Sequence, residues 1–461
     1  MVEGVAVSSR VAIVSADGHV GCPPGGYRDY IDPEYRHLLD ELGEEQQVAT
    51  SMMGVLHQIP ADSVEVVDPR GIRQGQPWEV GWDLSRRLTE LDKEGIAAEF
   101  VINGSGDAVP FFSWANKPRP ADVRSAGARA YNRWVADLVT DSKGRLFANA
   151  EVDQRTDRET STRELKWIAE HGFVSVTVPG IVHDPSHPPL CSREYDWFWA
   201  ACADLNLNLN LHAGWGMAQG LPFEGMKAAM TGMLSLENFD FSEADEQLKA
   251  LDGDNVDSPF ALDMGPRQAM WQLMLGGVFD RYPSLTLVLT EVRADWLPPT
   301  LAYLDRRFAE HKAPVALSPS EYFARNCVAT PSAPHRAEIA MRHQIGVDRL
   351  LFGADLPHPE STWPNTREWI RDVMQGVPQE EAQKILSGNA IRVYGLDADA
   401  IDRVAQRIGP RPEEIFGESH LDDRLIAHFH QRAGYEKPAE TVDVGKIQER
   451  LATDFTAVRQ R

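Results

Sequence analysis

The chain contains few cysteines and no long apolar run. Its four cysteines lie far apart among 461 residues without a CxxC pair, which excludes a disulfide framework and a thiolate zinc site. The apolar runs are too short for a membrane span, and the N-terminus has no basic flank followed by a long apolar core. We therefore expect no membrane segment and a cytoplasmic protein.

Positive charge is also scarce. The chain has 46 Lys and Arg residues against 69 Asp and Glu residues, which gives a formal net charge of −23. This balance argues against nucleic acid or an anionic membrane surface as the main partner. The hydrophobic share of 43% and the charged share of 25% are ordinary for a soluble globular protein. We expect a protein that acts on a small-molecule substrate and forms a homo-oligomer, a dimer.

Short apolar runs alternate with amphipathic segments along most of the chain. The runs predict buried strands and the amphipathic segments predict helices, which is the order of βα units in a parallel sheet. Eight such units predict an α/β fold, a closed (β/α)8 barrel of the TIM type. The predicted strands are residues 11–15, 97–103, 146–152, 173–178, 207–211, 285–290, 326–329 and 350–355.

Two segments interrupt or follow the predicted barrel of residues 1–396. An insertion at about residues 215–258, after the fifth strand, contains several Met residues and ends in an acidic stretch. It predicts either a pocket wall for a large hydrophobic substrate or a subunit interface, and its composition favours neither. Residues 397–461 predict a C-terminal helical extension, with a helix over 447–458.

A long irregular segment, residues 20–80, separates the first strand from the second, and loops of this length are usually functional. Arg70, Arg73, Trp78 and Trp82 lie in or just after it as candidates for substrate contact. For each of them a solvated surface position is the simpler interpretation.

Acidic and imidazole side chains follow the predicted strands where these end. The strands of a barrel end at one rim, and carboxylates crowded there would raise one another's pKa. A divalent cation removes this repulsion, and mixed carboxylate and imidazole ligands suit Zn²⁺, Mn²⁺ or Fe²⁺. The predicted ligands of this cation are Asp17, His19, His212, Glu291 and Asp355.

The end of the eighth strand is the most informative of these positions. Asp355 arrives where the apolar run of residues 350–352 stops, and His358 follows within a proline-rich stretch. Barrel enzymes place catalytic groups at such strand ends, although an Asp that caps the next helix is an alternative.

Several stretches resemble the amidohydrolase-related family, the metal-dependent group that includes aminocarboxymuconate semialdehyde decarboxylase and resorcylate-type decarboxylases. The resemblance covers roughly residues 10–396. It is carried by VSADGHV (14–20), NLHAG (210–214), FDRYPSLTLVLTEVRADWLP (279–298), SEYFARN (320–326), IGVDRLLFGADLPHPESTWPN (345–365) and GNAIRVYGL (388–396).

The resemblance implies roles for individual residues. Asp17 and His19 stand where the family has its first-strand metal ligands, and His212 matches the fifth-strand ligand. Asp355 matches the eighth-strand Asp that binds metal and handles protons. Decarboxylases of the family usually have a catalytic His at the end of strand six, where this chain has Glu291. Strand four offers no Lys for the carbamate that bridges two metals in binuclear relatives, which favours one ion without excluding two.

The absence of that His directs the functional prediction toward hydrolysis. We predict a metal-dependent hydrolase that activates a water molecule to cleave an amide, ester or thioester, which could be a bulky acyl-CoA thioester. Asp355 would act as general base and ligand, Glu291 as a second acid/base or ligand, and His358 as an oxyanion donor or orienting group. The alternatives are a metal-dependent non-oxidative decarboxylase of an aromatic or enoic acid, and a binding protein that has lost turnover.

Overall fold

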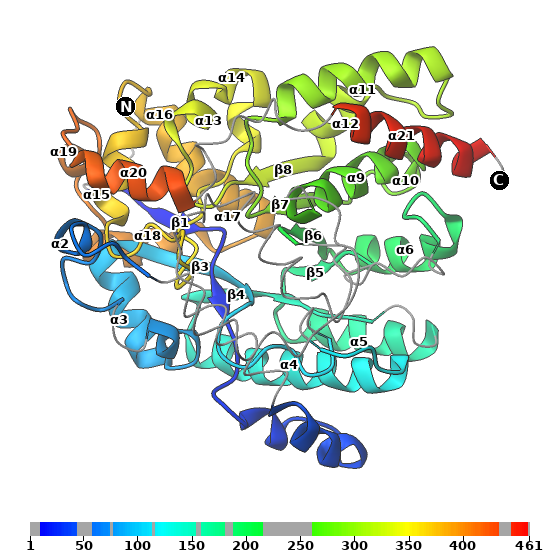
Figure 1. The fold of residues 1–461 in the computed structure, drawn as a ribbon, viewed down its shortest axis with the longest axis horizontal. Coiled ribbons are helices and arrows are strands. Elements are labelled where there is room, and N and C mark those ends of the chain that lie inside the picture. Colours follow the sequence, from blue (N-terminus) through cyan, green and yellow to red (C-terminus); the bar gives the residue numbers. More distant parts are fainter. Residues whose placement is uncertain are drawn as a thin grey trace, which may run out of the picture.

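A computed structural model describes residues 10–43, 58–73, 77–112, 116–153, 158–179, 188–214, 261–432 and 444–459 of the chain. In this structure eight strands form one parallel sheet surrounded by helices (Figure 1). The strands are β1 (Ile13–Ser15), β2 (His19–Val20), β3 (Ile96–Asn103), β4 (Leu146–Ala150), β5 (Ser175–Thr177), β6 (Asn208–His212), β7 (Leu287–Thr290) and β8 (Cys327–Thr330).

The sheet closes through an extended segment, residues 350–356, that runs between β8 and β1. On one side the amide of Leu351 donates to the carbonyl of Ala329 at 2.9 Å, and on the other the amide of Ala16 donates to Phe352 at 2.7 Å. The strand order β1-β3-β4-β5-β6-β7-β8 follows the sequence, as in a barrel of successive βα units. The predicted (β/α)8 barrel is therefore confirmed. Residues 350–356 take the place of its eighth strand and pair with the segments on both sides through isolated β-bridges.

The buried apolar side chains form two clusters, and successive residues of a strand belong to one cluster and the other in turn. Val288 belongs to one cluster, whereas its neighbours Leu287 and Leu289 belong to the other. Since successive residues of a barrel strand face inward and outward in turn, the smaller cluster fills the barrel and the larger one packs under the helices. Tyr394 joins the inner cluster and stacks on Phe100 with ring centroids 4.9 Å apart.

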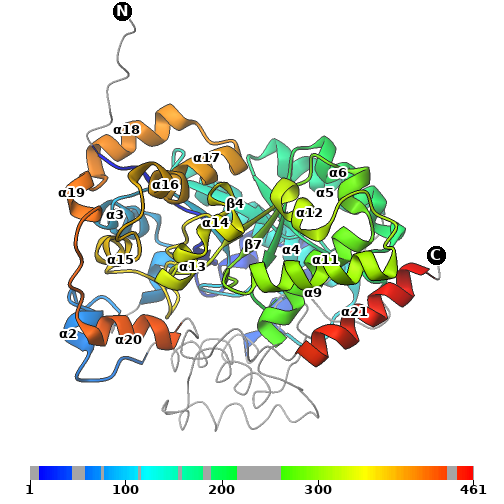
Figure 2. The ribbon, with the colours of Figure 1, turned by 90° about the horizontal axis from the view of Figure 1, so that it is seen from above.

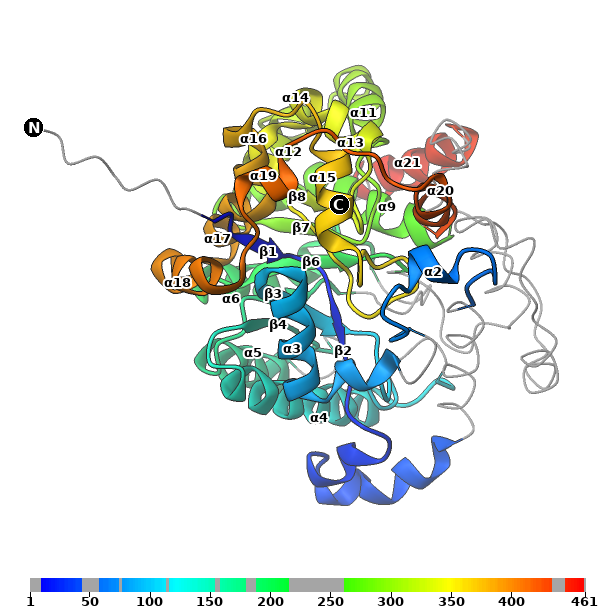
Figure 3. The ribbon, with the colours of Figure 1, turned by 90° about the vertical axis from the view of Figure 1, so that its left-hand side faces the viewer.

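The helices that cover the barrel begin and end at recognisable signals. For α3 (Leu84–Glu94), the side chain of Asp83 accepts a hydrogen bond from the Arg86 amide, and Gly95 ends the helix in the left-handed conformation. Figure 3 shows α3 lying over β3.

The other barrel helices are α2 (Val64–Val67), α4 (Ala121–Asp141), α5 (Arg158–Glu170), α6 (Asp196–Asp204), α9 (Ala261–Leu275), α10 (Val278–Arg281), α11 (Leu297–His311), α12 (Pro319–Asn326), α13 (Arg336–Ala340), α14 (Arg342–Ile345), α15 (Thr366–Val373), α16 (Gln379–Gln383) and α17 (Asn389–Tyr394). The 3-10 and π turns are η1 (Gly26–Asp29), η2 (Pro33–Glu41), η3 (Pro77–Gly81), η4 (Arg193–Tyr195), η5 (Val347–Arg349) and η6 (Lys384–Gly388).

Beyond residue 396 the chain continues as α18 (Ala398–Ile408), α19 (Pro412–Ile415), α20 (Asp423–Arg432) and α21 (Val444–Arg459). Helix α20 lies beside α2, and α21 lies beside α9 (Figure 2). Division of the chain into two units at residue 396 stays a prediction. The insertion at 215–258 lies outside the described residues. Among the helices that the structure describes, none has the length and apolar character needed to cross a membrane.

Candidate metal centre

All five predicted ligands lie at the carboxyl ends of the barrel strands. Asp17 lies in the turn between β1 and β2, His19 begins β2, and His212 ends β6. Glu291 directly follows β7, and Asp355 lies in the segment that closes the barrel. The barrel thus brings residues from the first and the last strand to one rim, as such folds do for catalytic groups.

The ligand atoms of these side chains face one another. The Nε2 atom of His19 lies 3.1 Å from Oε2 of Glu291, 3.1 Å from Oδ1 of Asp355 and 3.7 Å from Oδ1 of Asp17. The Nε2 atom of His212 lies 2.9 Å from the same Glu291 oxygen and 3.9 Å from Asp17 Oδ1. Two ligands bound to one ion at about 2.1 Å and at right angles are about 3 Å apart, so these spacings match the edges of a coordination sphere.

Unpartnered buried atoms support the same interpretation. Both carboxylate oxygens of Asp17 and of Asp355 are buried, and they accept no hydrogen bond from any described residue. The Nδ1 atom of His19 lies 2.8 Å from the carbonyl oxygen of Asn103, and a hydrogen bond there leaves the Nε2 lone pair facing the carboxylates. Carboxylate oxygens and imidazole nitrogens are a donor set for Mn²⁺, Fe²⁺ or Zn²⁺, so the residues fit a divalent cation.

The pKa values of the clustered side chains are shifted by burial and by their mutual charges. Burial, together with the Glu291 carboxylate, raises the pKa of Asp17 to about 6, and burial raises the pKa of Asp355 well above its usual range. Burial alone would lower the pKa of His212, but the Glu291 carboxylate outweighs it and raises that pKa to about 10. Because three acids share one buried site, they must bind protons or a cation to remain there.

His358 joins the cluster from the loop that follows Asp355. Its ring stacks on His19 with centroids 3.5 Å apart, and its Nδ1 lies 3.3 Å from Oδ1 of Asp355 and 3.5 Å from Oε2 of Glu291. Its Nε2 lies 3.1 Å from the carbonyl oxygen of Gly104 and can donate to it. Both ring nitrogens of His358 therefore face oxygen atoms, and its ligand atom lies close enough to those of His19, Glu291 and Asp355 for the four to hold an ion.

Two acids of the cluster have an uncommon backbone conformation. Glu291 has φ 56° and Asp355 has φ 59°, in the left-handed region that residues other than glycine rarely occupy. Such conformations cost of order 1–3 kcal/mol and collect at functional sites, where the surrounding structure holds them. The strand ends are therefore shaped to turn both carboxylates toward the cluster.

Arg73 is a neighbour of the site for which the sequence favoured a solvated position. It is only 3% exposed, and its Nη2 donates to the carbonyls of His358 at 3.0 Å and Pro359 at 2.6 Å. Its Nε and Nη1 atoms have no hydrogen-bond partner in the described part of the chain. Two buried, unpartnered donors of a cation beside the cluster are suited to binding an anionic group. Arg70, by contrast, pairs with Glu90 and Glu94.

Glu151, directly after β4, was missed as a neighbour of the cluster. Its buried Oε1 accepts hydrogen bonds from Asn103 Nδ2 at 2.6 Å and Thr177 Oγ1 at 3.0 Å, while its Oε2 has no partner among the described residues. The signal that could have found it is the same as for the other acids, a carboxylate where a buried strand ends. The predicted strand, 146–152, ran past this position.

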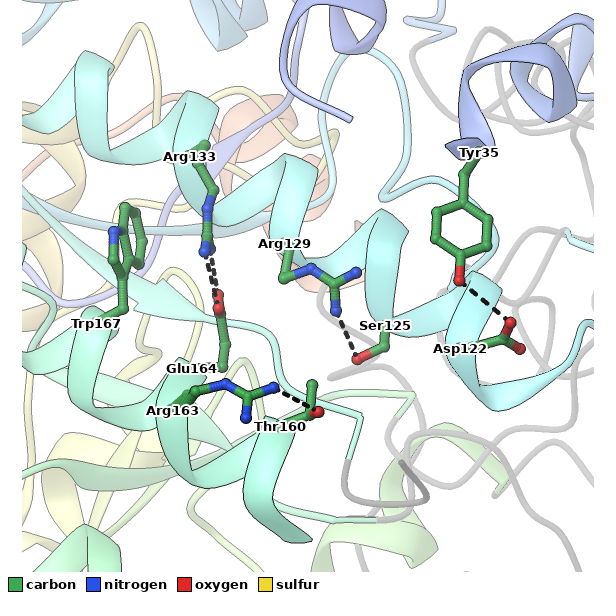
Figure 4. A pocket seen from close by; sticks show the side chains of 9 residues that line it. All are labelled: Tyr35, Asp122, Ser125, Arg129, Arg133, Thr160, Arg163, Glu164 and Trp167. Carbon is green, nitrogen blue, oxygen red and sulfur yellow. Dashed lines mark hydrogen bonds and ion pairs between the residues drawn. The ribbon is translucent and has the colours of Figure 1, made fainter. Parts of the chain in front are cut away.

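A surface pocket between α4 and α5 is separate from this cluster (Figure 4). It is lined by three arginines that already have acidic or hydroxyl partners: Arg133 pairs with Glu164, Arg129 donates to Ser125, and Arg163 donates to Thr160. It contains none of the cluster's ligand residues, and we assign it no catalytic role.

Comparison with known proteins finds one matching family model and several relatives. The family model Amidohydro_2, described as amidohydrolase, matches residues 109–396. A gamma-resorcylate decarboxylase from Polaromonas sp. (strain JS666 / ATCC BAA-500) is 26% identical over 328 residues, which cover 68% of this chain and 87% of that protein.

Two solved structures have a similar fold. One is a dihydroxybenzoic acid decarboxylase from Polaromonas sp. JS666 with bound manganese and the inhibitor 2-nitroresorcinol, with TM-score 0.57, 19% identity and coverage of 85% of this chain and 99% of that one. The other is a 5-carboxyvanillate decarboxylase from Sphingomonas paucimobilis, with TM-score 0.54, 18% identity and coverage of 84% and 100%.

These findings contradict the predicted hydrolysis of an amide, ester or thioester. The curated relative is a decarboxylase, as are both enzymes of similar fold. The prediction went wrong because Glu291 was weighed as the loss of a catalytic His. In the structure, Glu291 lies among three imidazoles, those of His19, His212 and His358, so histidines surround this position although the residue itself is an acid.

Proposed function

The chain belongs to the amidohydrolase family, and on that premise we propose that it is a metal-dependent non-oxidative decarboxylase of an aromatic or enoic acid. The observation that carries this proposal is the cluster itself. Buried carboxylate oxygens that have no hydrogen-bond partner in the described part of the chain converge with two imidazole nitrogens, and a curated protein similar to this chain is a decarboxylase.

Two overlapping groups have ligand atoms close enough together to hold an ion: Asp17, His19, His212 and Glu291, and His19, Glu291, Asp355 and His358. From these we assign Asp17, His19, His212 and Asp355 as the residues that would hold one divalent ion, with Glu291 as a further ligand. When bound, the ion would supply the positive charge that neutralises these acids and attracts an anionic substrate. Manganese is the first candidate among Mn²⁺, Fe²⁺ and Zn²⁺, because the relative of similar fold from Polaromonas contains it. A homodimer and a cytoplasmic location stay predictions.

Different side chains of the site would bind the substrate carboxylate and transfer the proton in decarboxylation. The Nε and Nη1 atoms of Arg73 have no hydrogen-bond partner among the described residues, and we assign this guanidinium to the carboxylate of the substrate, which it can bind in a fixed orientation. The bond between that carboxylate and its carbon then breaks, CO₂ leaves, and the electron pair stays on the carbon. A proton must replace CO₂ there.

Asp355 is the group that we assign to this proton transfer. Its Oδ1 lies 3.3 Å from Nδ1 of His358, so the imidazole can orient the carboxyl group. His358 in turn is held through its Nε2 by the carbonyl of Gly104. The carbon that loses CO₂ receives the proton from Asp355, and solvent returns one to Asp355 after release of the product.

The experiment measures the bound metal of freshly purified protein, and then CO₂ release from 2,6-dihydroxybenzoate, 5-carboxyvanillate and related acids. We expect activity that EDTA removes and Mn²⁺ restores. Asp355→Asn should fold and release CO₂ at least about 100-fold more slowly, since it loses both a ligand and a proton carrier. The control is Asp399→Asn, which changes an exposed carboxylate of α18.

CO₂ release that survives chelation, or an active Asp355→Asn variant, would reject the proposal. Hydrolysis products without CO₂ would reject it as well. For Arg73, replacement by Gln should raise KM more than it lowers kcat, and an unchanged KM would remove its assignment to the substrate carboxylate.

A further inference from the structure

Arg87 extends from α3 to the seam where the barrel closes. The residue is 1% exposed, and its guanidinium donates in three directions. Nη1 donates to the carbonyl of His19 at 2.8 Å and to that of Val80 at 3.0 Å. Nη2 donates to the carbonyl of Leu356 at 3.2 Å, and Nε donates to Oε2 of Glu99 at 2.8 Å.

Two of these carbonyls belong to the two segments that carry the metal ligands. His19 is itself a ligand candidate, and Leu356 directly follows Asp355. The same segments are joined by backbone hydrogen bonds, from the His19 amide to Leu356 at 2.7 Å and from the Asp355 amide to Asp17 at 2.9 Å. Arg87 therefore connects the first-strand half of the cluster to the last-strand half.

Glu99 orients the guanidinium of Arg87 by accepting the hydrogen bond from its Nε atom. It is fully buried on β3, and it lies against the turn that contains Asp17 and His19. A Cβ atom added at Gly18 would lie 2.5 Å from Oε1 of Glu99 and 3.1 Å from Nη2 of Arg87. This position needs glycine because the ion pair fills the space directly beneath the turn.

Stability alone does not account for this pair. Removing two charges from water is costly, and apolar residues of similar volume often stabilise a fold as well or better. What apolar residues cannot do is hold three backbone carbonyls and a carboxylate at set positions, which the planar guanidinium does through its fork of donors.

We infer that Arg87, oriented by Glu99, is a positioning residue that sets how the Asp17–His19 turn and Asp355 stand relative to each other. This inference rests on the proposed metal centre, because the distance between the two segments matters only if they share an ion. Residues that orient metal ligands without touching the ion typically change its affinity by 10- to 100-fold when replaced.

Arg145 offers a matched control at the other end of the barrel. It precedes β4, is 7% exposed, and donates to the carbonyls of Ile96 and Ala97 at 2.9 and 2.7 Å. It also pairs with Asp92 at 2.7 Å. Arg145 thus makes the same kinds of contact as Arg87, with two carbonyls in place of three and one carboxylate, at the amino ends of the strands.

The test compares Arg87→Lys, Glu99→Gln and Arg145→Lys in the full chain. Mn²⁺ affinity is measured by the loss of the free-ion signal in electron paramagnetic resonance, and Tm is measured on metal-free protein. We expect all three variants to lose Tm by similar amounts. Arg87→Lys and Glu99→Gln should bind Mn²⁺ at least about 10-fold more weakly than wild type, and Arg145→Lys should bind it like wild type.

Three outcomes would overturn the inference. Wild-type Mn²⁺ affinity in Arg87→Lys and Glu99→Gln would overturn it alone, because the metal centre would still be present. Equal weakening in all three variants would also overturn it, since the effect would then follow stability and not position. No Mn²⁺ binding by the wild type would overturn the metal centre and this inference together. If Arg87→Lys does not fold, Glu99→Gln decides.

Discussion

Replacing Gly104 by alanine should weaken metal binding at the proposed centre through a single methyl group. Gly104 follows β3 with φ +142°, and a Cβ there would lie 2.3 Å from Nδ1 of His19 and 3.0 Å from its Cγ. Ordinary van der Waals contact begins at 3.4 Å, so the imidazole would have to move by about 1 Å. That movement would strain the hydrogen bond between His19 Nδ1 and the carbonyl of Asn103, now 2.8 Å long.

The expected magnitude has two parts. The backbone conformation at Gly104 costs an alanine about 1–3 kcal/mol, and the overlap with a packed side chain costs about 1–3 kcal/mol more. Since a displaced ligand typically weakens metal binding 10- to 100-fold, Mn²⁺ affinity should fall by at least about 10-fold. His358 should be disturbed as well, because its Nε2 contacts the Gly104 carbonyl.

The assay combines thermal unfolding of metal-free protein with Mn²⁺ titration. Gly172→Ala is the matched control, because Gly172 also has a positive φ, +78°, but nothing lies within 4 Å of its added Cβ. The control should lose about 1–2 kcal/mol of stability and keep its Mn²⁺ affinity. The reasoning is refuted if Gly104→Ala binds Mn²⁺ like the wild type and loses no more stability than Gly172→Ala.

Two further predictions concern residues outside the ligand set. Burial raises the pKa of Glu151 from 4.5 to about 8, so between these pH values the folded protein keeps a proton that the unfolded chain releases. The contribution of Glu151 to the free energy of unfolding is therefore complete below about pH 4.5 and is lost as the pH rises through about 8. Between these values the wild type should lose about 1.4 kcal/mol per pH unit relative to Glu151→Gln, and parallel unfolding curves for the two proteins would contradict this. On α21, Asp454 accepts hydrogen bonds from Trp271 Nε1 at 2.7 Å and Gln272 Nε2 at 2.8 Å. Asp454→Ala leaves the indole donor without its acceptor, so it should lower the free energy of unfolding by about 1–3 kcal/mol and speed proteolysis of α21. Glu449→Ala, on the exposed face of the same helix, is the control and should do neither. Equal proteolysis rates for the two variants would contradict the prediction that Asp454 attaches α21 to α9.

The order of the elements could be read from the sequence because it is a local property. Periodicity within a few residues separates a buried strand from an amphipathic helix, and eight alternations leave few folds other than the barrel. The convergence of Asp17, His19, His212, Glu291 and Asp355 followed from the fold alone, since the strands of a barrel end at one rim.

The reaction could not be read in the same way. A carboxylate at the end of β7 is compatible with hydrolysis or with decarboxylation, and hydrolysis was contradicted only by the comparison with known decarboxylases. In the structure Oε2 of Glu291 lies 3.1 Å from His19, 2.9 Å from His212 and 3.5 Å from His358. None of these distances has a signature in the sequence near Glu291.

By itself the sequence determined the fold class, the rim on which the site lies and five side chains of the cluster. Only the tertiary structure decided that Arg73 is buried against residues 358–359, that Gly104 lies against His19, and that Arg87 joins the carbonyls of His19 and Leu356. The physical reason is the separation of the contacting residues along the sequence. Strand and helix patterns arise between near neighbours, whereas these contacts join segments that meet only when the barrel closes.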